Sequence, residues 1–124
     1  LRKMLRNEPT EFTPALQRWD YLYSKDAGRA YYLIGEKGRD GAVYCVGSGH
    51  ARPLREYILK MAEITGTEEP GIGMRPYPSG AVMNLCADTD NLYEDTGFVP
   101  EYTFEDGIRE TIAWLMGQST GERK

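Results

Sequence analysis

Apolar residues gather along this chain in three short runs that are typical of β-strands. Residues 19–23 are rich in aromatic side chains, and residues 42–46 and 81–87 are apolar and bounded by glycine or polar residues. Aromatic and β-branched residues favour strands, and glycine ends them. We expect residues 42–46 to form a short buried strand. Three strands make a thin sheet, which is more stable when it packs against a neighbouring part of a protein.

Other apolar residues recur every three or four positions, which predicts helices that each bury one face. The first helix follows Ser24, which can cap it, and is expected to end at Gly35. The second carries Pro53 in its first turn. The last begins with the capping-box pattern of Thr103 to Asp106. The residues expected to face the core are Ala27, Ala30, Tyr31 and Ile34 in the first helix, Leu54, Ile58, Met61 and Ala62 in the second, and Ile108, Ile112 and Leu115 in the last.

The order of these elements predicts a single α/β domain, residues 1–124, with a small mixed sheet of about three strands and helices packed around it. Residues 1–10 are interpreted as a remnant helix and linker, and residues 66–80 as a loop rich in proline and glycine. Residues 88–94 are predicted to form a short helix, and residues 118–124 a frayed tail. The chain opens without Met inside a helix-like segment, as expected of a cut or processed product.

The composition is that of a soluble globular protein. The net charge of −4 and the pI near 5.0 argue against a nucleic-acid scaffold, which carries a basic face. No apolar run is long enough to cross a bilayer, so no membrane partner is expected. Cys45 and Cys86 lie in apolar runs, and we interpret them as two buried free thiols in a reducing cytoplasm.

Two glycine clusters have the spacing of dinucleotide-binding loops. Gly35, Gly38 and Gly41 follow a helix and precede a strand, the reverse of the order that points a helix N-terminus at a pyrophosphate, so they are interpreted as a plain turn. Residues 47–49 have the better order but lack the third glycine, where Arg52 stands. That turn either faces a phosphate or is a tight structural turn, and the second interpretation is favoured. Its amides remain candidates for an anion site.

No complete catalytic or metal-binding set is present in the sequence. Tyr21 and Lys25 imitate the tyrosine–lysine pair of short-chain dehydrogenases, but Tyr21 sits in a strand-like run, which would separate the two by about 13 Å. His50, the single histidine, is interpreted as an exposed loop residue, with a hydrogen bond to substrate as the alternative. Asp88 and Asp90 begin a calcium-loop pattern without its glycine and glutamate, and we interpret them as a helix cap.

Four segments, in order, resemble the C-terminal half of extended short-chain dehydrogenases that act on nucleotide sugars. Residues 19–30 resemble the family's Arg-Asp-Tyr strand-to-helix segment, and residues 43–49 its Tyr-Asn-Val-Gly-Ser-Gly turn. Residues 87–100 resemble its Ala-Asp … Leu-Gly-Trp-x-Pro segment, and residues 104–115 its closing Phe-Glu-Glu-Gly-Ile helix. Each match is weak by itself, but four in sequence are specific for the superfamily.

The resemblance implies a portion of an NAD(P)-dependent epimerase, dehydratase or reductase. In the whole enzyme NAD or NADP accepts hydride from a sugar carbon while a tyrosine removes the hydroxyl proton. Those groups belong to the N-terminal Rossmann half, which the resemblance implies is missing here. This chain is then expected to bind the nucleotide-sugar substrate, to hold no cofactor and no catalytic residue, and to be inactive alone. A monomer or weak dimer is expected.

The resemblance also selects candidate substrate-binding residues on the first strand. Trp19 stands where the family pattern has an arginine that contacts the diphosphate, and it either packs against a base or fills the core. Arg18 comes one residue early and, in a strand, would point to the opposite face. Tyr21 completes this group of candidates. Asp20 and Asp26 match the pattern and are interpreted as structural, pinning the strand–helix junction.

Three further arginines are candidates for the diphosphate. Arg52 and Arg55 start a helix beside the Gly-Ser-Gly turn, where they either face phosphate oxygens or form a solvated helix face. Arg75 precedes a proline, as in many relatives, but it lies farther from Asp88 than in the family pattern. Its phosphate role therefore requires an insertion in the loop.

An alternative is a stand-alone α/β binding or interaction module without catalysis. Such a module would need a sealed, polar surface, whereas half of an enzyme would expose apolar residues that the other half covers. The residues that discriminate the two are Tyr31, Tyr32, Phe98 and Trp114.

Overall fold

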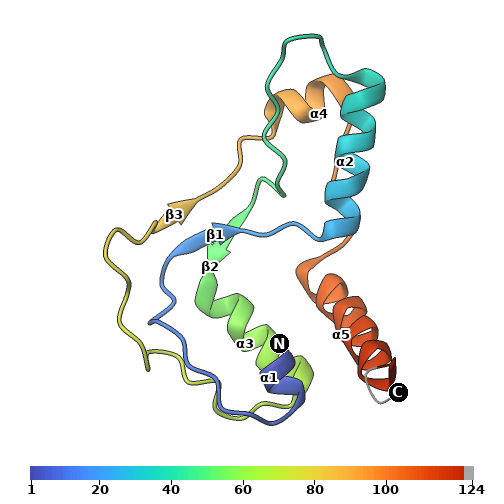
Figure 1. Cartoon of the computed structure of the whole chain (residues 1–124). Coiled ribbons are helices and arrows are strands. Elements are labelled where there is room, and N and C mark those ends of the chain that lie inside the picture. Colours follow the sequence, from blue (N-terminus) through green and yellow to red (C-terminus); the bar gives the residue numbers. More distant parts are fainter. Residues whose placement is uncertain (122–124) are drawn as a thin grey trace.

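A three-stranded mixed sheet forms the centre of the computed structural model, which describes residues 1–121 (Figure 1). The central strand is β1 (Arg18–Asp20). It pairs antiparallel with β2 (Ala51–Pro53) and parallel with β3 (Asn84–Leu85). The predicted α/β class and small mixed sheet are thus confirmed. The strands β1 and β3 are shorter than the apolar runs 19–23 and 81–87 that predict them.

Helices surround this sheet. They are α1 (Arg2–Leu5), α2 (Ser24–Lys37), α3 (Leu54–Thr65), α4 (Asp90–Thr96) and α5 (Phe104–Gly121). Gly66 and Gly97 end α3 and α4 in the left-handed conformation that glycine adopts without strain. The predicted end at Gly35 is wrong, since α2 continues to Lys37. The frayed tail expected at residues 118–124 stays a prediction: α5 is helical as far as Gly121, and the rest of that tail lies outside the described residues.

The side chains form two separate hydrophobic clusters rather than one core. Cluster one contains Met4, Ala15, Ile58 and Ala62 as its buried members, and lies between α1 and α3. Cluster two contains Ala30, Leu92 and Phe98, and lies between α2 and α4. The predicted inner face of α3 supplies Ile58 and Ala62 to cluster one, and that of α2 supplies Ala30 to cluster two. Tyr31 is exposed, and Leu33 packs against cluster two instead.

Residues 42–46 do not form the predicted buried strand. The segment lies beside α4 and, within residues 1–121, pairs with no other strand. Val43 is 83% exposed. Cys45 and Cys86 are free but exposed, so the prediction that both thiols are buried is wrong. The cause is the same for both, because a short apolar run is buried only where another layer covers it.

Two carboxylates fasten connecting segments of the chain, one between the two clusters and one between cluster two and α5. Asp20 accepts backbone N–H bonds from Ser48 at 2.9 Å, Gly49 at 3.0 Å and Ala87 at 3.2 Å, and it also accepts the Ser48 hydroxyl. The buried carboxylate of Asp26 accepts the N–H groups of residues 101 and 102, both at 3.0 Å. Their predicted structural role is confirmed.

Candidate functional site

The β1–β2 face brings together an arginine and several aromatic rings. Trp19 lies directly opposite Arg52 in the antiparallel pair, so both side chains project from the same side of the sheet. The Arg52 guanidinium lies 5.0 Å from the centre of the Tyr57 ring, within cation–π range. Its Nε is 3.2 Å from Glu56, and its Nη1 is 3.5 Å from Glu105. This half-exposed cation is thus held by one ring and two carboxylates.

Tyr21 continues the same face, because residues two apart in a strand point the same way. Its ring meets Tyr57 edge-on at 4.9 Å between centroids, and Phe104 at 6.4 Å. The Tyr57 hydroxyl donates to the backbone carbonyl of Trp19 at 3.0 Å. The aromatic face therefore consists of Trp19, Tyr21, Tyr57 and Phe104, with Arg52 across its edge.

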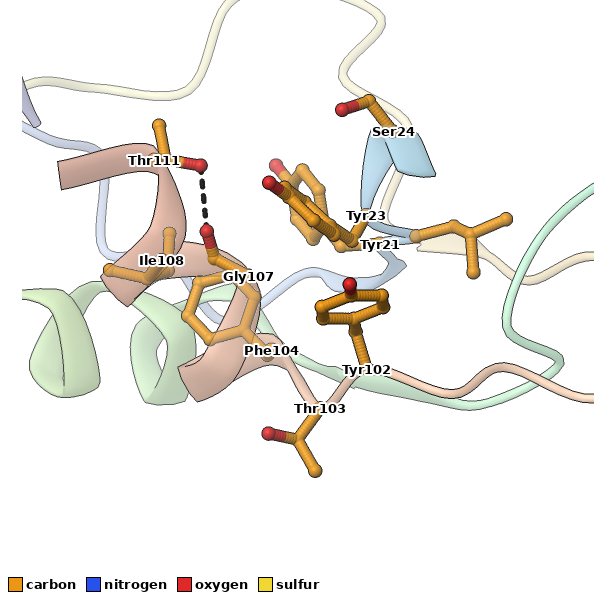
Figure 2. A pocket seen from close by; sticks show the side chains of 10 residues that line it. Tyr21, Tyr23, Ser24, Tyr102, Thr103, Phe104, Gly107, Ile108 and Thr111 are labelled. Carbon is orange, nitrogen blue, oxygen red and sulfur yellow. Dashed lines mark hydrogen bonds between the residues drawn. The ribbon is translucent and has the colours of Figure 1, made fainter. Parts of the chain in front are cut away.

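A pocket of about 220 Å³ opens between the start of α2 and the start of α5, next to the aromatic face (Figure 2). Figure 2 shows the rings of Tyr21 and Tyr23 on the β1–α2 connection facing the first turn of α5. A side chain at Gly107 would come within about 3.0 Å of the Tyr23 ring, so glycine permits this close packing. The pocket is lined by Tyr21, Leu22, Tyr23, Ser24, Tyr102, Thr103, Phe104, Gly107, Ile108 and Thr111.

A charged cluster borders this pocket. The Glu110 carboxylate accepts a hydrogen bond from the Tyr23 hydroxyl at 2.9 Å and pairs with Lys25 Nζ at 2.7 Å. These contacts lower the pKa of Glu110, with Lys25 contributing most, and they raise the pKa of both Lys25 and Tyr23. The cluster keeps Glu110 ionised and fastens α2 to α5.

We expect Glu110→Gln to lower the melting temperature at pH 7, and by progressively less as the pH falls below the ordinary pKa of this carboxyl. The pKa of Glu110 lies below its ordinary value of 4.5 in the folded protein, so its contribution is complete above that pH and is lost as the pH falls through the lower, folded value. Thermal unfolding between pH 3 and 7 measures the gap. Glu63→Gln, which removes a surface pair with Lys60, is the control and should change little. A gap that persists undiminished at pH 3 would show that the charge is not the cause.

Tyr21 and Lys25, whose spacing is predicted to match a catalytic pair only by accident, make separate contacts. Tyr21 precedes α2 and contacts rings, whereas Lys25 lies within α2 and is bound to Glu110. Burial raises the pKa of Tyr21, the opposite of the shift that activates a tyrosine as a base.

The Gly-Ser-Gly turn is a structural turn. The N–H groups of Ser48 and Gly49 already donate to Asp20, so this carboxylate occupies the place where the sequence left room for an anion. Of the other glycine cluster, Gly38 and Gly41 lie in the predicted turn, since Gly38 caps α2 and Gly41 has a φ of +74°. Gly35 lies inside α2, so the prediction is wrong at that position. His50 is exposed, as predicted for a loop residue.

The remaining predicted site residues lie apart from the aromatic face. Arg18 is exposed and donates to the carbonyl of Ala51 at 2.9 Å. Arg55 is exposed on α3. Arg75 pairs with Glu11 at 3.0 Å beside the N-terminal segment. The structure therefore brings together three of the six predicted residues, Trp19, Tyr21 and Arg52.

Tyr57 and Phe104 belong to the same face but were not among the predicted site residues. Tyr57 lies three residues after Leu54 on the inner side of α3, so the helical period already placed it near the sheet. Phe104 begins α5, and no local pattern relates it to β1.

Comparison with known proteins adds a family likeness to this geometry. No family model matches the chain. A dTDP-glucose 4,6-dehydratase of Escherichia coli is 30% identical over 108 residues, which are 78% of this chain and 30% of that protein. The structure of UDP-glucose 4-epimerase of Thermotoga maritima with UDP-glucose aligns with a TM-score of 0.84 and 29% identity, over 94% of this chain and 37% of its own.

A second solved structure, MoeE5 in complex with UDP-glucuronic acid and NAD, aligns with a TM-score of 0.81 and 28% identity, over 94% of this chain and 40% of its own. The chain therefore spans only 30–40% of the length of these relatives. Within residues 1–121, the structure has no helix that is both long and apolar enough to span a membrane.

Proposed function

Since this chain belongs to the extended short-chain dehydrogenase/reductase family of NAD-dependent nucleotide-sugar epimerases and dehydratases, we propose that it forms the substrate-binding side of such an enzyme. The nucleotide sugar lies against the aromatic face, and the part of the enzyme that carries out the chemistry lies outside these residues. A nucleotide sugar offers three features to bind: a planar base, a doubly charged diphosphate and a sugar ring.

The observation that carries this proposal is the pairing of Trp19 with Arg52 across β1 and β2. In the family pattern an arginine occupies the position of Trp19. Here the register of β1 and β2 places the guanidinium of Arg52, on the neighbouring strand, on the same face. Arg52 then pairs with the diphosphate, as the planar guanidinium does well, in exchange for its contacts with Glu56 and Glu105. Trp19 and Tyr21 supply rings for the base or sugar.

The described residues do not fit a dinucleotide cofactor. The one turn with a strand-to-helix order has its amides filled by Asp20, and Tyr21 and Lys25 are apart in their contacts. We therefore assign NAD or NADP, and the catalytic tyrosine and lysine, to a Rossmann half outside this chain. By itself the chain is inactive and binds no cofactor. In this proposal it works in the cytoplasm, and alone it is a monomer or weak dimer.

The exposed aromatic residues support a chain that is covered by another part of an enzyme. Tyr31 is 66% exposed, Tyr32 64% and Trp114 58%, whereas Phe98 is buried in cluster two. A stand-alone module would cover such rings or replace them with polar residues. These residues therefore favour the enzyme proposal over the alternative of an independent interaction module.

Titration of the chain with UDP-glucose, UDP-glucuronic acid and dTDP-glucose tests the proposal. We expect weak binding, in the millimolar range, because half a cleft leaves a ligand exposed. Amide and indole NMR shifts should change at Trp19, Tyr21 and Arg52. Replacing Arg52 with alanine should weaken binding about tenfold, the effect of losing one charge-assisted contact of about 1.4 kcal/mol.

The matched control is Arg109→Ala, which removes an exposed arginine on α5 that pairs with Asp106 at 3.8 Å. It should leave the affinity unchanged. Equal affinity in the wild type and the Arg52 variant, or shifts confined to the surroundings of Arg75, would place the nucleotide sugar elsewhere and overturn this assignment. Absence of any binding at tens of millimolar would remove the substrate-binding role from the isolated chain.

A further inference from the structure

The guanidinium of Arg52 meets a carboxylate at each of the edges with which it can bind a phosphate. Its Nε donates to Glu56 at 3.2 Å, and its Nη1 lies 3.5 Å from Glu105. An arginine binds phosphate best through two adjacent N–H groups, and Nε and Nη1 belong to the two different edges that offer such a pair. A phosphate that binds Arg52 with two hydrogen bonds must therefore displace at least one of these carboxylates.

The two carboxylates differ in how they hold Arg52. Glu56 follows Arg52 by four residues and accepts a hydrogen bond. Glu105 belongs to α5, and its contact is longer than the about 2.7–3.2 Å that is usual for an N–H···O hydrogen bond. The contact with Glu105 is thus the weaker one, and the exchange with a phosphate begins there.

Glu105 has little room to leave Arg52 without a change in α5. Its side chain is 25% exposed, whereas that of Glu56 is 53% exposed. The preceding residue, Phe104, packs against the Tyr57 ring with 4.6 Å between the centroids. A phosphate on Arg52 brings negative charge close to the Glu105 carboxylate, and like charges repel more strongly where little water screens them. The first turn of α5 therefore experiences this repulsion.

The second turn of α5 is fastened independently of Arg52. Gly107 packs closely against the Tyr23 ring, and Glu110 is bound to Tyr23 and Lys25. These contacts lie on the β1–α2 connection and on α2, away from the guanidinium (Figure 2). A response to a ligand on Arg52 is thus expected at residues 104–106 and not at Glu110.

We propose that Glu105 is a positioning residue for Arg52, which it holds in the free chain and releases when a phosphate binds. The proposal rests on the proposed function, because it requires that Arg52 contact the diphosphate. Glu105 then competes with the ligand, so the chain binds a nucleotide sugar less tightly than it would without this carboxylate. The release also transmits occupancy of the site to the first turn of α5.

The affinity of the chain for UDP-glucose and for inorganic pyrophosphate, measured by NMR titration, tests the competition. Glu105→Gln should bind both about threefold more tightly, the effect of removing one partly exposed ion pair. Asp106→Asn is the matched control, because it removes one negative charge from the same helical turn, where its ion pair is with Arg109. It should leave the affinity nearly unchanged. A gain in affinity does not arise from damage to the fold, which would only weaken binding.

Arg52→Ala separates this proposal from the proposed function. In the Arg52→Ala background, Glu105→Gln should change the affinity hardly at all, because the competition requires the guanidinium. If Arg52→Ala alone binds as tightly as the wild type, or if no variant binds at tens of millimolar, both proposals fail. If Arg52→Ala weakens binding but Glu105→Gln matches the wild type or Asp106→Asn, only the role of Glu105 is overturned.

The amide signals of α5 test the release. With UDP-glucose, the signals of residues 104–106 should shift in the wild type, while that of Glu110 stays in place. In Glu105→Gln the shifts should be smaller, because a neutral side chain is not repelled by the phosphate. Shifts at Arg52 without any at residues 104–106 would overturn the release and leave the proposed function standing.

Discussion

Replacing Asp20 with alanine will lower the free energy of unfolding by about 4 kcal/mol. The carboxylate accepts three backbone N–H groups, from Ser48, Gly49 and Ala87, and the hydroxyl of Ser48. Hydrogen bonds to a charged group contribute about 1.5–3 kcal/mol each, and donors left without a partner add a desolvation cost. The half-buried position of Asp20 moderates the total. Urea unfolding followed by circular dichroism measures it.

Asp20→Asn separates charge from shape in this prediction. Asparagine keeps one acceptor oxygen but turns an amide toward the remaining donors, so it should lose about half as much stability as alanine. Asp40→Ala, at an exposed turn residue, should stay within about 0.5 kcal/mol of the wild type. A loss of unfolding free energy below about 1 kcal/mol for Asp20→Ala would mean that water replaces the carboxylate. The hydrogen bonds of Asp20 would then contribute little to stability.

Truncating Leu92 to alanine will cost about 3 kcal/mol. The side chain is completely buried in cluster two, and neighbouring side chains cannot fill the space that it leaves. Thermal or urea unfolding measures the loss. The control is the next residue in α4, Tyr93, which is 59% exposed and should lose less than about 1 kcal/mol as alanine.

The double variant of Leu92 and Ile58 tests whether the two hydrophobic clusters are independent. Ile58 is 2% exposed in cluster one and shares no cluster neighbour with Leu92. Since the sites share no partner, the two losses should add within about 0.5 kcal/mol. A strongly non-additive result would show that the clusters respond as one packed core.

Helices were the part of the fold that sequence reasoning predicted best. Ile58 and Ala62 are buried on α3 as their spacing predicts, because residues four apart in a helix share a face whatever packs against it. The run 42–46 shows the opposite case. Its side chains alternate as in a strand, yet burial depends on a neighbouring layer that no local pattern contains.

The sequence predicted those site residues whose position does not depend on how β1 pairs with its neighbouring strands. Trp19 and Tyr21 follow from the family pattern, but the sequence left open whether Arg52 faces a ligand or solvent. The antiparallel register answers part of this, because it sets Arg52 opposite Trp19. The position of Arg75, away from the aromatic face, could not be predicted for a different reason. Its loop has no periodicity, and the contact with Glu11 joins residues far apart in the chain.

The chain contributes residues alternately to the two hydrophobic clusters, so the molecule consists of two packed parts joined by several connecting segments. The chain passes between them at β1, at residues 47–51 and at residues 85–89, and all three passages meet at the carboxylate of Asp20. Residues 101–102, which lead from cluster two to α5, are fastened by Asp26. Bending at these two hinge points would swing α2 and α4 relative to the aromatic face without opening either cluster. The stiffness between these parts then rests on Asp20, on Asp26 and on the Glu110 cluster that fastens α2 to α5.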